Sequence, residues 1–186
     1  MLQKIQKSIR SYFFKQALNK LNREKKVVGF VNAKRLGLLF ECNSADDYRE
    51  ILSIVRVLEK GGKSVFAMIY INAKALPSYT MAQLNFFYCL RSEIALNLKI
   101  RNAHLLNFIN SSFDILIDLS PGDFFPLKFI AGLTNAPYKV GIYNDAYVEV
   151  FDLLVSESSG QSVTMRAEKV LDCIKMINPP ADDQQF

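Results

Sequence analysis

Two carboxylates flank a tight turn in the middle of the chain, and they are the residues best placed to do chemistry. Asp118 ends a short apolar run, and Asp123 follows the turn that contains Ser120 and Gly122. Two carboxylates near a strand end can perform acid–base catalysis or hold a metal ion. Turn chemistry offers a second interpretation, in which Asp118 binds loop amides and Asp123 caps a helix that begins at Phe124. We favour the second interpretation, because turns alone account for these residue types.

A ligand site at this turn would include residues from neighbouring strand ends. In open parallel sheets, ligands bind beyond the carboxyl ends of the strands, near the point where the strand order reverses. Asn43 follows one expected strand and Tyr143 ends another. The candidate ligand-binding residues are therefore Asp118, Ser120, Gly122, Asp123, Asn43 and Tyr143.

Motifs for cofactors and metals are missing from the sequence. Neither G-x-G-x-x-G nor G-x-x-x-x-G-K-[ST] occurs, and Asp46 and Asp47 would repel a phosphate from the start of the helix that follows Asn43. His104 is the single histidine, which excludes a multi-histidine metal site. We therefore expect no cofactor, no metal and no catalytic residue, and favour a chain that is not an enzyme.

Short apolar runs alternate with helical patterns along most of the chain, and the Gly, Pro and Ser residues between them mark turns and caps. Alternation of this kind predicts βαβ units and hence a parallel sheet. The expected fold is a three-layer α/β/α sandwich with a mostly parallel, Rossmann-like sheet of five or six strands and an N-terminal amphipathic helix. The expected strands are 36–42, 64–71, 115–119, 138–143 and 151–155, and the expected helices are 44–60, 102–110, 124–132 and 162–177. The segment 84–90 suits a strand or a helix, and 27–31 could be a further strand.

The positive charge of the chain is confined to its N-terminal arm. Residues 1–26 carry eight basic side chains against one acidic side chain, which gives this arm a net charge of +7. The remaining residues sum to −2. A nearly neutral body does not predict a nucleic-acid groove, so we expect no nucleic acid as a partner.

Residues 1–24 predict an amphipathic helix with two kinds of surface. One face holds Leu2, Ile5, Ile9, Tyr12 and Phe13, and the other holds Lys4, Lys7, Arg10 and Lys15. Beyond Phe13 the apolar stripe rotates onto the basic side, at Phe14, Ala17, Leu18 and Leu21. Either the helix bends there or both sides find a partner. Packing against its own domain or a sister subunit is the favoured interpretation, and an anionic membrane surface or a partner protein is the alternative. The residues of that contact would be Lys4, Lys7, Arg10, Tyr12, Phe13 and Lys15.

We divide the chain into a basic helix with its connector (1–33), an α/β domain (34–178) and a tail (179–186). The longest uncharged run, 75–90, is interrupted by polar residues and does not predict a transmembrane helix. The start of the chain has basic residues in place of the apolar centre of a signal peptide. Three widely spaced cysteines suit a reducing compartment. The expected location is the cytoplasm, with peripheral membrane contact as an option.

The stretch 113–141 resembles the N-terminal half of bacterial heptosyltransferases and related two-domain glycosyltransferases. Those enzymes carry a strand of the type F-D-x-x-I-D-L, a helix, and then G-A-P-x-x-x-G. The matching residues here are Phe113, Asp114, Ile117, Asp118, Leu119, Asn135, Ala136, Pro137 and Gly141. The resemblance implies a shared architecture. It departs at the loop after the first strand, where those enzymes have Gly-Asp and this chain has 42–44, Cys-Asn-Ser. They also bind the sugar nucleotide with a second domain.

Taken whole, the chain resembles a family of small uncharacterised bacterial α/β proteins, which brings no activity with it. Our leading hypothesis is a non-catalytic binding or interaction domain, associated with a membrane surface or a partner protein through residues 1–26. The alternative is a small-ligand-binding or glycosyltransferase-like enzyme that uses the loop at the carboxyl end of the strand in 113–119.

Overall fold

Six parallel strands form one sheet in the computed structural model, which describes residues 2–94, 100, 102–121, 124–157 and 160–177, with side chains from Ser11 onward. The strand order is β3-β2-β1-β4-β5-β6, and each adjacent pair is parallel. The strands are β1 (Arg35–Glu41), β2 (Ser64–Ile71), β3 (Phe86–Leu90), β4 (Ile115–Asp118), β5 (Tyr138–Ile142) and β6 (Leu153–Val155). This confirms the predicted fold class, and within the open segment 84–90 residues 86–90 form a strand.

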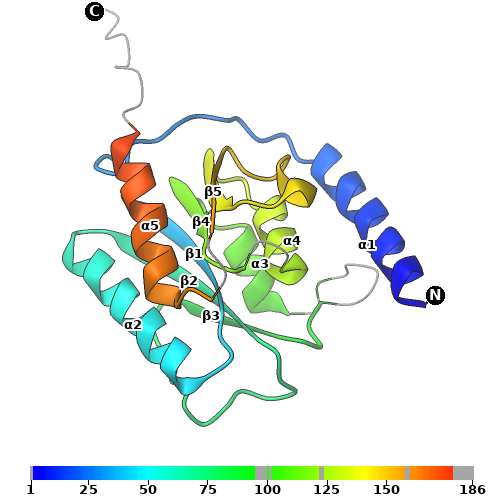
Figure 1. Cartoon of the computed structure of the whole chain (residues 1–186), viewed down its shortest axis with the longest axis horizontal. Helices are drawn as coiled ribbons and strands as arrows, with labels where there is room; N and C mark the ends of the chain where they lie inside the picture. Colours follow the sequence, from blue (N-terminus) through cyan, green and yellow to red (C-terminus); the bar gives the residue numbers. More distant parts are fainter. Residues whose placement is uncertain (1, 95–99, 101, 122–123, 158–159, 178–186) are drawn as a thin grey trace, which may run out of the picture.

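Helices cover both faces of the sheet (Figure 1). One apolar cluster joins the sheet to α2 (Ala45–Lys60) and α5 (Val163–Met176). A second cluster joins it to α3 (Ala103–Ile109) and α4 (Phe125–Leu133), and α1 (Leu2–Asn19) packs on α4 from outside. A short helical turn, η1 (Asp145–Tyr147), lies between β5 and β6. The three predicted layers are therefore present.

The strand order reverses between β1 and β4. From β1 the chain proceeds outward through β2 to β3, and α3 then returns it to β4 on the other side of β1. Leu39 of β1 lies beside Asp118 of β4, so the carboxyl ends of these two strands meet at the reversal. This is where the candidate ligand residues were expected to gather.

Local sequence signals explain most helix ends. Ser44 and Ser162 accept hydrogen bonds from the N–H groups of Asp47 and Met165, as N-caps do. Gly62 follows α2 with a φ of 81°, a conformation that glycine adopts readily. At α4 the expectation of a helix beginning at Phe124 with Asp123 as its cap was wrong. The helix begins one residue later, with Phe124 at the N-cap and no side-chain cap bond, and Asp123 lies outside the described residues.

The segment 27–31 is not a strand, which corrects the other open expectation. Val27 and Val31 are exposed, and residues 30–32 form a turn. Just before it, the Lys26 N–H bonds to the Pro137 carbonyl oxygen at 3.0 Å. An exposed apolar pair has no buried face to hold a strand register, so the segment serves as a connector.

Helix α1 is continuous from Leu2 to Asn19 and packs on its own domain. Phe14 is buried against the rings of Phe125 and Phe129, each with a centroid 5.8 Å away. Gly132 makes this approach possible, because a Cβ there would lie 2.5 Å from Phe14 and 3.0 Å from Leu18. The stripe that begins at Phe14 is therefore the face of α1 that meets the body.

Gly132→Ala should lower the free energy of unfolding by about 1–3 kcal/mol, because the added methyl group overpacks the contact with α1. At an open helix position the same change would stabilise by about 1 kcal/mol. Urea unfolding measures the difference. In a Phe14→Ala background the methyl group has room, so Gly132→Ala should become neutral or stabilising. A stabilising effect in the wild-type chain would contradict the packing described.

Candidate functional site

Asp118 and Ser120 do come together at the carboxyl edge of β4, and Lys128 from α4 joins them. The Oδ1 atom of Asp118 accepts hydrogen bonds from the N–H and Oγ of Ser120, at 2.9 and 2.6 Å. Its Oδ2 atom lies 2.8 Å from Lys128 Nζ. All three residues are fully buried. Both oxygens of the candidate carboxylate are thus occupied by groups of the chain itself.

Lys128 is the residue that sequence reasoning missed. It is the one charged residue in the apolar helix α4, and its ammonium group also lies 3.2 Å from Ser120 Oγ and 5.5 Å from the centre of the Phe151 ring. Removal of a charge from water is costly unless it is paired and hydrogen-bonded. A lone lysine in an otherwise apolar helix therefore signals a buried carboxylate partner, and Asp118 is that partner.

The Asn43 N–H and the Tyr143 hydroxyl bond to residues near them in the chain and not to Asp118 or Ser120. Asn43 is exposed beyond β1, and its N–H bonds to Asp47 Oδ2 at 2.8 Å. Tyr143 is half exposed beyond β5 and donates its hydroxyl to Asp145, which raises the pKa of Tyr143. Gly122 and Asp123 lie outside the described residues.

Arg166 of α5 links the residue that follows β4 to the segment between β6 and α5. Its Nε atom donates to the Leu119 carbonyl oxygen at 3.0 Å, and its Nη1 atom donates to Gln161 O at 2.8 Å and to Glu157 Oε1 at 3.3 Å. Glu50 of α2 accepts the Thr164 N–H at 2.7 Å. A guanidinium group at this position could bind an anion, but here it is shared among three oxygens of its own chain.

A thiol, that of Cys42, follows β1 at the same edge of the sheet. Cys42 is buried and its Sγ atom donates to Ser44 O at 3.4 Å. Burial, followed by the charge of Asp47, raises the pKa of the Cys42 thiol, which disfavours the reactive thiolate. In the part of the chain that the structure describes, no three His, Cys, Asp or Glu side chains are grouped as a metal site. His104 is exposed on α3.

The predicted contact surface on α1 is a second candidate site. Tyr12 and Phe13 are 61% and 40% exposed, with ring centroids 5.7 Å apart, and Lys15 is also exposed. Lys4, Lys7 and Arg10 lie in the same helix, in a part where only the backbone is described. No described helix is long and apolar enough to cross a membrane.

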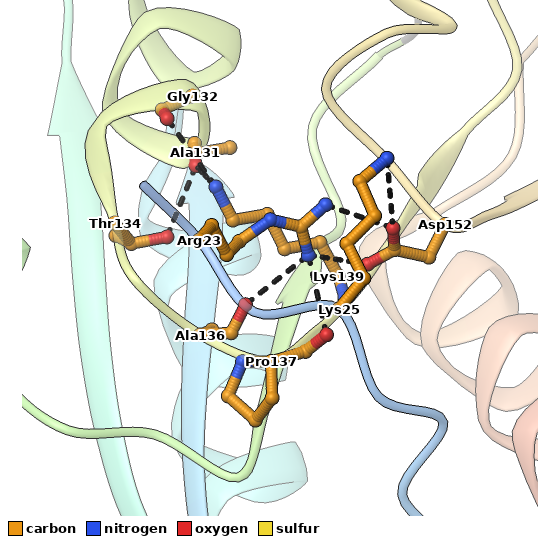
Figure 2. A network of polar contacts seen from close by, with 9 residues as sticks. All are labelled: Arg23, Lys25, Ala131, Gly132, Thr134, Ala136, Pro137, Lys139 and Asp152. Carbon is orange, nitrogen blue, oxygen red and sulfur yellow. Dashed lines mark hydrogen bonds and ion pairs between the residues drawn. The ribbon is translucent and has the colours of Figure 1, made fainter. Parts of the chain in front are cut away.

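An ion pair anchors the connector that follows α1 (Figure 2). Arg23 binds Asp152 with two hydrogen bonds, from Nη1 to Oδ2 at 2.5 Å and from Nη2 to Oδ1 at 2.8 Å. Nη1 also donates to the carbonyl oxygens of Ala136 and Pro137, each at 3.2 Å. The two charged side chains are only 7% and 14% exposed. The connector is therefore fixed beside the amino ends of β5 and β6.

Lys139 of β5 is a buried residue that also contacts Asp152. Its buried Nζ atom donates to the carbonyl oxygens of Ala131 and Gly132 at the end of α4, at 2.7 and 3.3 Å. Its N–H bonds to Asp152 Oδ2 at 2.9 Å. Burial, followed by the charge of Arg23, lowers the pKa of Lys139 to about 7. This lysine thus links the carboxyl end of α4 to the strand that holds the connector (Figure 2).

Comparison with protein-family models identifies the family of the chain. A model described as "Family of unknown function (DUF6913)" matches residues 6–174. The chain belongs to this family. A comparison with curated proteins finds no match.

Among solved structures, the chain is similar to the E. coli heptosyltransferase WaaC with ADP. The TM-score is 0.51 at 12% sequence identity, over 78% of this chain and 48% of that chain. The same enzyme with ADP-2-deoxy-2-fluoro heptose gives a TM-score of 0.46 at 13% identity, over 78% of this chain and 50% of that one. The chain thus spans about half the length of these structures, and the likeness extends to the fold alone. It agrees with the resemblance seen in 113–141.

Asp118→Asn should destabilise the domain by about 3–5 kcal/mol, because it leaves the ammonium group of Lys128 buried without a counter-charge. Urea unfolding provides the measurement. The double variant Asp118→Asn/Lys128→Met should lose less than the sum of the losses in Asp118→Asn and Lys128→Met, since it removes both charges. Additive losses in the double variant would show that the two residues do not act as a pair.

The stability of the wild-type chain should rise with pH relative to Lys139→Met. The pKa of Lys139 is about 7 in the folded chain and near 10.4 in an unfolded one. Between these values the unfolded chain binds more protons, so unfolding becomes harder as pH rises, by up to about 1.4 kcal/mol per pH unit. Urea unfolding from pH 7 to 9.5 tests this, since cysteines and tyrosines contribute equally to both proteins. Parallel pH profiles would rule out the lowered pKa.

Proposed function

We propose that this chain is a binding domain that presents α1 to an anionic membrane surface. The observation that carries the proposal is the orientation of α1. Phe14 and Leu18 are used on the contact with α4, while Tyr12 and Phe13 lie exposed and adjacent on another side of the same helix. Aromatic side chains on one side of a basic helix suit the boundary between lipid headgroups and acyl chains.

Charge supports the same surface. The arm of residues 1–26 has a net charge of +7, against −2 for the rest of the chain. Anionic lipids attract basic segments by about 1 kcal/mol for each Lys or Arg near the surface. In the sequence, Leu2, Ile5 and Ile9 share the helical phase of Tyr12 and Phe13, so the apolar face extends toward the start of α1.

The anchor of the connector gives this surface a fixed place. Arg23 and Asp152 hold the chain beyond α1, and Gly132 receives Phe14. A helix held in this way loses less conformational freedom on binding than a free tail would. The domain would therefore meet the membrane in a defined orientation.

The alternative, a ligand site of the glycosyltransferase type at the carboxyl edge, has weaker support. Its main carboxylate, Asp118, is neutralised by Lys128, and Arg166 is shared among oxygens of its own chain. The likeness to WaaC extends to the fold and carries no residue role across. We therefore rank it second.

Binding to vesicles tests the proposal. The full chain should sediment with phosphatidylserine–phosphatidylcholine vesicles and much less with pure phosphatidylcholine, and added salt should weaken the binding. Tyr12→Ser/Phe13→Ser should lower the partition coefficient at least tenfold, since burial of an aromatic side chain contributes about 1.5–3 kcal/mol. Lys15→Glu should lower it about fivefold or more.

Lys60→Glu is the matched control, because Lys60 is exposed on α2 and the change in net charge is the same. Equal losses from Lys15→Glu and Lys60→Glu would show attraction to net charge alone and contradict a role for α1. Point variants are preferable to a deletion of 1–26, because the deletion would also remove Phe14 and Arg23 from the body. If none of the proteins sediments with anionic vesicles, the membrane proposal is wrong.

A further inference from the structure

The outer edge of β3 carries backbone groups that point away from the sheet. In a parallel ladder, the N–H and C=O of one residue point to the same neighbour, and the direction alternates along the strand. The Ala67 N–H of β2 bonds to the Asn85 carbonyl oxygen, which fixes the phase of that alternation. The backbone groups of Phe87 and Cys89 therefore point to β2, and those of Phe86, Tyr88 and Leu90 point outward.

Some of the outward-pointing backbone groups of β3 already have hydrogen-bond partners within the chain. The Phe86 N–H bonds to Gln83 O at 3.3 Å, and the Leu90 N–H bonds to Glu93 Oε2 at 2.6 Å. The Tyr88 carbonyl oxygen receives Asn102 Nδ2 at 3.4 Å. Among the described residues, this leaves the Phe86 carbonyl oxygen and the Tyr88 N–H without a hydrogen-bond partner.

The two remaining groups fit a single residue of an added parallel strand. The N–H of that residue would bond to Phe86 O, and its C=O would accept from the Tyr88 N–H, as in any parallel bridge. An antiparallel neighbour would need both groups of one residue. The Phe86 N–H is already bonded to Gln83 O, and the Tyr88 carbonyl oxygen already accepts from Asn102. Neither residue therefore offers both of its backbone groups to an antiparallel neighbour. This disfavours a symmetric antiparallel pairing of two β3 edges and favours a parallel strand from another segment.

A groove lies along the same edge. It has a volume of about 400 Å³, and its lining includes Leu76, Met81, Phe86, Phe87 and Leu90. Loop residues 76–83 contribute one side of it, and Asn102 and His104 at the start of α3 contribute another. Glu93 and Asn102, which bond to each other at 2.7 Å, lie where the β3 edge ends. The groove therefore offers apolar side-chain contacts beside the Phe86 carbonyl oxygen and the Tyr88 N–H.

We propose that this groove binds an extended peptide segment of a partner protein, which adds to the sheet as a short parallel strand beside β3. Backbone pairing would supply affinity and the apolar lining would select the side chains, as in other cases of strand addition. The carboxylate of Glu93, at the carboxyl end of β3, favours a basic residue or an uncharged end on the peptide there. The partner is thus a peptide with alternating apolar residues and little negative charge.

Selection from a randomised heptapeptide library against the full chain tests this proposal. Met81→Glu places a charge in the groove, since Met81 is 53% exposed and its backbone alone bonds to Tyr48. Leu84→Glu is the control, because Leu84 is 87% exposed in the same loop and does not line the groove. Selected peptides should bind the wild type and Leu84→Glu equally, and Met81→Glu at least about tenfold more weakly.

N-methylation of the selected peptides tests the backbone pairing, and it does not depend on whether a variant folds. Methylation of the one amide that donates to Phe86 O should weaken binding at least about tenfold. Methylation of the next amide, which points away from β3, should leave it unchanged. The Tyr88 amide proton should also exchange more slowly with solvent in the complex. The proposal fails if no peptide is enriched, or if N-methylation has no effect at any position.

Discussion

Buried charge around α4 is the constraint on which the rest of this structure depends. Lys128 near the start of the helix is paired with Asp118 of β4, and Lys139 of β5 donates to the carbonyl oxygens at its end. Neither lysine can be left without partners in a dry core. The two contacts therefore fix the position of α4 over β4 and β5. Gly132, in the last turn of that fixed helix, then determines where α1 can dock.

At the carboxyl edge of the β1–β4 reversal, the side chains of Asp118, Ser120 and Arg166 bond to other groups of the chain. In this fold class the same edge often binds ligands. Asp118 and Ser120 satisfy Lys128, and Arg166 joins β4 to α5. The chain shares its fold with WaaC at 12% identity, so architecture and site chemistry are separable here. The two surfaces that we propose for binding lie at the periphery, on the outer side of α1 and along the edge of β3.

The sequence predicted the elements whose signals are local. Ser44 and Ser162 marked helix starts, Gly61 and Gly62 marked an end, and apolar runs marked the strands. It failed at the start of α4, where Phe124 occupies the N-cap without a side-chain bond. It also failed to identify Lys128, because the partner of a buried lysine depends on how α4 packs on β4, even though Asp118 is only ten residues away. The direction in which each β3 backbone group points required the register with β2, and no residue pattern encodes it.

The two peripheral surfaces belong to different parts of the fold. The connector after α1 is anchored at β5 and β6, whereas β3 is the strand at the opposite edge of the sheet. A peptide beside β3 would therefore not contact Arg23 or Asp152. If both proposals hold, the domain would bring a bound peptide close to a membrane surface.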